Sequence, residues 1–132
     1  MEIKRNEATV NRPEGDRVID GSYVFIDIPA FITQLTEEKA WEKNDRNGIT
    51  VFKSEKVTMV LTALQEGAEL INNKVDGFLS IQVLKGRVRI NTPDGDIEAG
   101  EYHIINFHPQ VPNSVKALSN VALLVTNYSK DH

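Results

Sequence analysis

The chain has 132 residues, of which 40% are hydrophobic and 26% charged, and these are ordinary values for one globular domain. Its net charge of −4 argues against a nucleic-acid-binding surface, and no run of about 18 apolar residues occurs that would span a membrane. The absence of cysteine excludes disulfides, zinc–thiolate sites and thiol nucleophiles, and a cytoplasmic location is expected.

Residues 1–20 are polar and predict an extended arm that is either mobile or laid along a neighbouring surface. The next segment, SYVFIDI (22–28), alternates between apolar and polar positions and predicts a first strand. After it, the stretch 29–40 places apolar residues on one side and begins with a proline, which predicts a short helix. Residues 43–48 have the composition of a loop.

From Ile49 onward the pattern is that of a β protein. Short apolar or alternating runs recur every 8–12 residues or so, with glycine, proline, aspartate or asparagine between them, which is typical of a sandwich or barrel. These runs are ITVFKS, VTMVLTAL, FLSIQVL, RVRINT, GEYHIINF, SVKAL and NVALLVTNY. The sequence therefore predicts an all-β antiparallel barrel with one short helix near its N-terminal end.

The order of the glycines and turns in the second half carries a family resemblance. Gly67, Asn73 and Gly77 precede LSIQVLKG, which ends at Gly86, and IEAGEYHIINFHPQVPNSV (97–115) follows. This arrangement resembles the two-motif core of the small single-domain cupins of the RmlC-like type, over about residues 50–127. The resemblance implies a jelly roll, or double-stranded β-helix barrel. We expect a single domain at 21–132 behind the polar arm at 1–20.

The resemblance also implies where a metal would bind, because the usual first motif supplies two histidines and a glutamate and the second motif a third histidine. One alignment places these histidines at Asn73 and Val75 with the glutamate at Leu79, and another places the histidines at Asn72 and Lys74. The third histidine falls on Asn113. An amide oxygen is a weak ligand for zinc, iron or manganese. No metal and no other cofactor is therefore expected.

Other polar residues near the expected barrel mouth each allow two interpretations. Lys74 is either a solvated loop charge or, if it faces inward, a group that favours an anionic ligand. His108 is either a ligand or base at the mouth or an exposed loop histidine. Gln82 is expected on the face of its strand opposite Leu79 and Ile81, although the reverse packing would let it reach a ligand. His103, in the middle of a predicted strand, is interpreted as structural.

Three functions remain open from the sequence, and whether the protein is an enzyme is not decided. The first is metal-free binding of a small organic molecule, neutral or anionic, in the barrel, between apolar walls that include Val60, Leu79, Ile81 and Leu124. The second is an atypical metal-dependent cupin enzyme of the dioxygenase, decarboxylase or sugar-epimerase type. The third is a structural cupin that has lost its site; a homodimer is expected, with no nucleic-acid or membrane partner. The ligand-binding candidates are Asn72, Asn73, Lys74, Gln82, His108 and Asn113.

Overall fold

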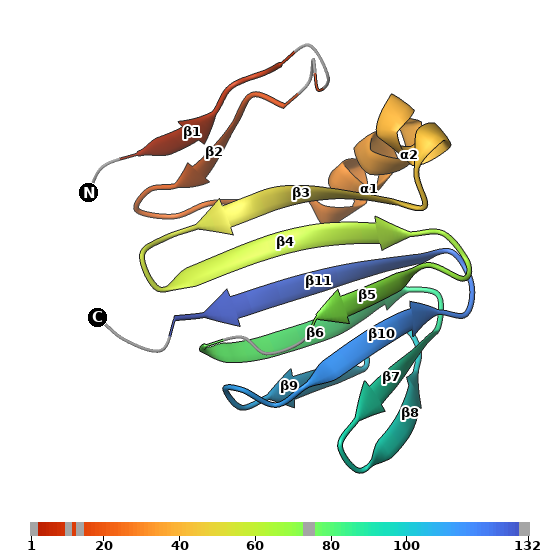
Figure 1. Ribbon diagram of the computed structural model, residues 1–132. Coiled ribbons are helices and arrows are strands. Elements are labelled where there is room, and N and C mark those ends of the chain that lie inside the picture. Colours follow the sequence, from red (N-terminus) through yellow and green to blue (C-terminus); the bar gives the residue numbers. More distant parts are fainter. Residues whose placement is uncertain (1–2, 10–11, 13–14, 73–75, 130–132) are drawn as a thin grey trace.

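The computed structural model describes residues 3–9, 12, 15–72 and 76–129. Two antiparallel sheets face each other, and the helices and an N-terminal hairpin lie beyond one side of the larger sheet (Figure 1). The larger sheet has the order β3-β4-β11-β6-β9 and the smaller β5-β10-β7-β8. The strands are β3 (Arg46–Lys53), β4 (Val57–Leu64), β5 (Glu69–Asn72), β6 (Phe78–Lys85), β7 (Val88–Thr92), β8 (Gly95–Ala99), β9 (Ile104–Phe107), β10 (Asn113–Ala117) and β11 (Val121–Tyr128). The predicted all-β barrel with a short helix is confirmed.

Alternation along the strands fills the space between the two sheets with apolar side chains. In β6, Leu79, Ile81 and Val83 are buried while the residues between them are not. Val115 and Ala117 of β10 face them from the smaller sheet and belong to the same core cluster. Because successive side chains of a strand point to opposite faces, this pattern fixes which residues line the barrel.

A second core lies on the outer face of the larger sheet, under helix α1 (Ile28–Glu37). The side chain of Asp27 caps this helix by accepting a hydrogen bond of 3.1 Å from Ala30 N–H, and proline occupies the first turn. Leu35 is fully buried and packs with Leu61 of β4. The chain becomes extended at Glu38, so the predicted helix 29–40 ends at Glu37 and a short helix α2 (Lys39–Lys43) follows.

The prediction of a strand at 22–28 is wrong. The segment alternates as expected, with Val24 and Ile26 half-buried, but it pairs with no strand among the described residues. Tyr23 and Phe25 are both 85% exposed instead of facing another sheet. The alternation therefore reflects a segment that is half-buried on one side, and not a hydrogen-bonded strand.

The N-terminal arm folds back on itself and is fastened to the domain. Strands β1 (Lys4–Asn6) and β2 (Arg17–Asp20) form a two-stranded sheet beside β3 (Figure 1). Arg12 Nη2 lies 2.9 Å from Oε1 of Glu38 and 2.9 Å from the carbonyl oxygen of Gly48, to both of which it donates. The division of the chain at residue 20 stays a prediction.

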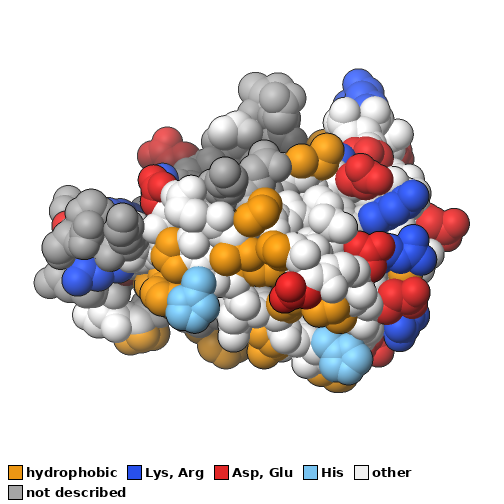
Figure 2. Space-filling model, turned by 60° about the horizontal axis from the view of Figure 1, so that its bottom comes forward, with side chains coloured by type: hydrophobic (Ala, Val, Ile, Leu, Met, Phe, Trp, Pro, Cys, Tyr) orange, Lys and Arg blue, Asp and Glu red, His pale blue; other side chains and the backbone are white. Residues whose placement is uncertain are grey.

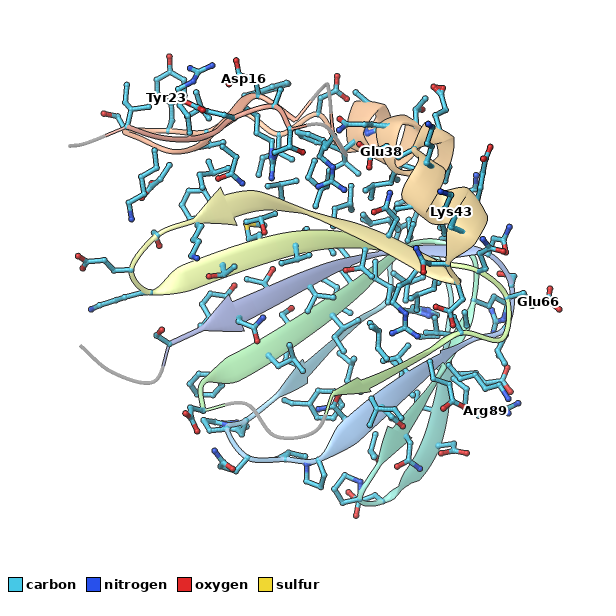
Figure 3. The ribbon with its side chains drawn as sticks, turned by 45° about the horizontal axis from the view of Figure 1, so that its top comes forward. Asp16, Tyr23, Glu38, Lys43, Glu66 and Arg89 are labelled. Atoms are coloured by element: carbon cyan, nitrogen blue, oxygen red, sulfur yellow. The ribbon has the colours of Figure 1, made fainter. Side chains whose placement is uncertain are left out.

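Glu38 sits at the centre of this attachment, beside the helices in Figure 3. Burial raises the pKa of its carboxyl group, but hydrogen bonds from Arg12, Gln34 and Asn47, together with the positive charge of Arg12, outweigh that effect and hold the pKa below the ordinary value. The Glu38 side chain is only 12% exposed. The carboxylate is therefore a specific acceptor for three donors from three segments.

None of the helices in the described part of the chain is long and apolar enough to cross a membrane.

Candidate functional site at the barrel mouth

Asn113 is a buried polar residue that the fold directs into the barrel. It begins β10, and its register partner is Asn72, the last residue of β5. Because side chains two apart share a face, Asn113 shares its face with Val115 and Ala117, which are both in the inner core. Asn113 itself is buried. The predicted turn before the strand thus delivers one amide to the apolar interior.

The hydrogen bonding of Asn113 is incomplete. Its Nδ2 donates to the carbonyl oxygen of Val111 at 3.2 Å, closing the loop that precedes β10. Its Oδ1 is buried and accepts no hydrogen bond from any residue the structure describes. Leaving a buried acceptor unpaired costs on the order of 1–3 kcal/mol. Among the described residues, Oδ1 of Asn113 is therefore a buried acceptor without a donor at the barrel mouth.

Two loops meet at the rim beside Asn113. Gln110 Nε2 donates to Oδ1 of Asp76 at 2.7 Å and ties the loop before β10 to the loop before β6. The exposed imidazole of His108 lies edge-on to the ring of Phe78, with centroids 4.9 Å apart. His108 therefore lies at the mouth, on its outer rim, and not inside the barrel. The sequence showed Asp76 only as a turn residue and gave no signal for the contact between Phe78 and His108.

The described residues at the position implied for a metal do not fit one. Asn113 offers a neutral amide oxygen, and Leu79, at the implied glutamate position, is a fully buried aliphatic side chain. Neither supplies the imidazole or carboxylate that zinc, iron or manganese prefers. Over residues 3–9, 12, 15–72 and 76–129, no three histidine, aspartate or glutamate side chains gather. Asn73 and Lys74 lie outside the described residues.

Two other predicted contacts fall on the far side of the larger sheet. Gln82 lies on the face of β6 opposite the buried residues, in register with Leu124 of β11. Leu124 packs with the core under the helices and not with the barrel core, so its expected place in the barrel wall is wrong. The alternation puts Gln82 away from Asn113 as well, and it does not join the site at the mouth.

His103 also differs from its predicted place in a strand. Its Nδ1 accepts a hydrogen bond of 2.9 Å from Gly100 N–H, which closes a turn just before β9. Tyr102 adopts a left-handed conformation in this turn, with φ of 70°. The strand is therefore shorter than the run GEYHIINF suggests, and His103 lies in the turn before it.

Several solved structures have a similar fold. A cupin superfamily protein from Desulfitobacterium hafniense DCB-2 has a TM-score of 0.63 at 14% identity, over 66% of this chain and 80% of that one. A protein of unknown function from Streptococcus pyogenes has a TM-score of 0.65 at 14% identity, over 86% of this chain and 93% of its own. An RmlC-like cupin from Desulfovibrio desulfuricans has a TM-score of 0.57 at 26% identity, over 63% of this chain and 81% of its own.

No protein-family model and no curated protein sequence matches the chain. The two facing sheets, their strand order and the similarity to several solved cupins nevertheless agree with the resemblance in the sequence. The chain folds as a small cupin domain of the RmlC-like type.

Proposed function

We propose that the barrel binds a small organic molecule without a transition metal, and that the molecule donates a hydrogen bond to Oδ1 of Asn113. The observation that carries the proposal is the buried, unpaired state of that oxygen among the described residues. A hydroxyl, an amide N–H or a protonated carboxyl group would supply the missing donor. Val115, which shares the face of Asn113 on β10, would supply part of the apolar contact.

The ligand class follows from what surrounds the acceptor. A neutral acceptor in an apolar interior favours a neutral donor, because an uncompensated charge there is costly. An anionic ligand would need a cation, and Lys74 is the candidate that the sequence offers. The proposal thus holds for a neutral donor, and it extends to an anion if Lys74 contributes its charge. We also propose that the protein is cytoplasmic.

The test uses tag-free, full-length protein purified without chelator. Native mass spectrometry before and after denaturation would detect a retained organic ligand, and a fragment library would be screened by amide chemical-shift changes. Asn113→Leu keeps the volume and removes the acceptor, so bound fragments should be lost. Asn106→Leu, at an exposed position of β9, is the matched control. Fragments that bind both variants as well as wild type would contradict the proposal.

We also propose that two copies of the chain pair through the arm, as a structural role of the domain. The support is a hollow of about 430 Å³ bordered by Ile3, Tyr23 and Phe25, which are all exposed. Figure 3 shows Tyr23 beside the hairpin, away from the barrel. A two-stranded sheet is marginal alone, and a second copy would cover these aromatic side chains. The double variant Tyr23→Ser and Phe25→Ser should halve the mass measured by light scattering; an unchanged mass would contradict pairing there.

A further inference from the structure

The barrel has a second opening in its side wall, between two strand edges. β8 ends the smaller sheet and β9 ends the larger one, and the two are not hydrogen-bonded to each other. A hollow of about 340 Å³ lies between them. This volume is within the range of small-molecule sites, about 300–1,000 Å³. We call it the lateral slot; Asn113 is not among the residues that line it.

The lateral slot has an apolar floor and an apolar rim. Its floor is formed by Ile81 and Ile90, which are fully buried members of the inner core. Its rim carries Ile97 of β8 and Ile104 of β9, which are 47% and 55% exposed. A molecule that covers these aliphatic side chains removes apolar surface from water, which contributes about 25 cal/mol of binding free energy for each Å² buried. The walls of the slot therefore favour a ligand with a mostly apolar surface.

The imidazole of His103 provides a hydrogen-bond donor at the lateral slot, and the structure identifies which ring nitrogen donates. His103 lines the hollow, and its Nδ1 is already occupied as the acceptor of Gly100 N–H. A neutral imidazole whose Nδ1 accepts a hydrogen bond carries its proton on Nε2. The turn thus fixes the tautomer. The Nε2–H donates to no residue that the structure describes, and we take it as the donor to an acceptor on a bound molecule. Figure 2 shows both described histidines on one face, each bordered by hydrophobic side chains.

The charges near the lateral slot are partly balanced. Glu98 lines the hollow and has Arg87 and Arg89 within 3.6 Å of its carboxylate oxygens. These three groups are about half exposed, so water screens them. Among the described residues that line the slot, no buried charge is left unpaired, so a neutral molecule is favoured over an ion.

We propose that the lateral slot binds a small, uncharged, mostly aliphatic molecule through its apolar walls and a single hydrogen bond from His103 Nε2–H to a carbonyl or hydroxyl oxygen. This site is separate from the barrel mouth: the slot offers a donor to an acceptor group, whereas Asn113 offers an acceptor to a donor group. The inference does not depend on the function proposed above.

The probe for the test is 2-heptanone, compared with heptanoate, which has the same chain length and a negative charge. Isoleucine δ1-methyl groups labelled with ¹³C report binding, because Ile97 and Ile104 lie on the rim. We expect 2-heptanone to shift these two methyl signals saturably and heptanoate to bind more weakly. Shifts confined to isoleucines that do not line the slot, such as Ile71, or no saturable shift, would overturn the proposal.

Two variants and two controls separate the parts of the proposal. His103→Asn keeps an oxygen that accepts from Gly100 N–H and removes the Nε2–H, and should weaken 2-heptanone binding about fivefold. Ile104→Ser should weaken it about tenfold, whereas Ile71→Ser, at an exposed isoleucine of β5, should not. Asn113→Leu should leave it unchanged. Equal affinity in all four variants, or loss only in Asn113→Leu, would overturn a separate site.

Discussion

Arg12 holds both carboxylate oxygens of Glu38. Its Nε lies 3.2 Å from Oε1 and 3.0 Å from Oε2, and its Nη2 lies 2.9 Å from Oε1. The two side chains are 26 positions apart in the chain, and they are 21% and 12% exposed. This pair joins the N-terminal arm to the point where α1 ends, so the arm's position depends on it.

Arg12→Met should destabilise the protein by about 2 kcal/mol, because hydrogen bonds to a charged, largely buried group are lost. Urea unfolding followed by circular dichroism measures this change. Arg46→Met is the matched control, since the Arg46–Asp45 pair is about half exposed and should contribute nothing measurable. Equal effects of the two substitutions would show that Arg12 does not fasten the arm.

The Glu38 carboxyl group should make the stability depend on acidity. Its folded-state pKa lies below the ordinary value of 4.5, so the unfolded chain takes up a proton more readily than the folded one. The stabilisation is complete above that value and is lost as the pH falls through the lower folded-state pKa. Unfolding free energies measured from about pH 5 to pH 3 should fall less steeply in Glu38→Gln than in wild type. Parallel curves would rule this group out.

Asn113→Leu should raise the free energy of unfolding of the ligand-free protein by about 1 kcal/mol, because a leucine of similar volume removes the unpaired buried oxygen. Urea unfolding of both proteins measures this difference. Asn106→Leu, on the exposed side of β9, should change the stability by less than about 0.5 kcal/mol. A clear loss of stability in Asn113→Leu would mean that the hydrogen bond from Nδ2 to Val111, or a partner of Oδ1 such as a buried water, outweighs the cost of the unpaired oxygen.

The double substitution Asn73→His and Asn113→His should create affinity for Ni²⁺ or Zn²⁺, since imidazole is a far better ligand than an amide. Metal content by mass spectrometry, and titration by calorimetry, measure it against wild type, for which we expect substoichiometric metal. Asn106→His with Asn113→His is the control. If the first pair gains no more affinity than the second, the alignment of residue 73 with the metal position is wrong.

The fold could be predicted where hydrophobic periodicity and turn residues agree. VTMVLTAL coincides with β4, and NVALLVTNY contains β11, because both strands are apolar on two faces. β5 and β8 were not predicted: their sequences ELIN and GDIEA are short and mix charged with apolar residues, and only their neighbours in the sheet hold them extended. Tertiary pairing, which no local pattern encodes, decided those two strands.

The candidate site could be predicted only in part. The predicted run SVKAL begins one residue after Asn113, where β10 starts, and the alternation of β6 placed Gln82 on the outer face. The unpaired oxygen of Asn113 could not be predicted. It depends on the conformation of the loop before β10, in which the carbonyl oxygen of Val111 accepts a hydrogen bond from Nδ2 of the same amide. The tautomer of His103 likewise depends on a turn that the sequence showed as part of a strand.

One strand serves as a shared wall between the two cores. In β11, Leu123 belongs to the barrel core and Leu124, the next residue, to the core under the helices. Removing the chain before about residue 50 would therefore leave β4 and β11 with a bare apolar face, which is a surface prone to aggregation. The shortest fragment that folds should include α1, even though the cupin motifs begin after it, and the barrel and the helical cover should unfold in a single transition.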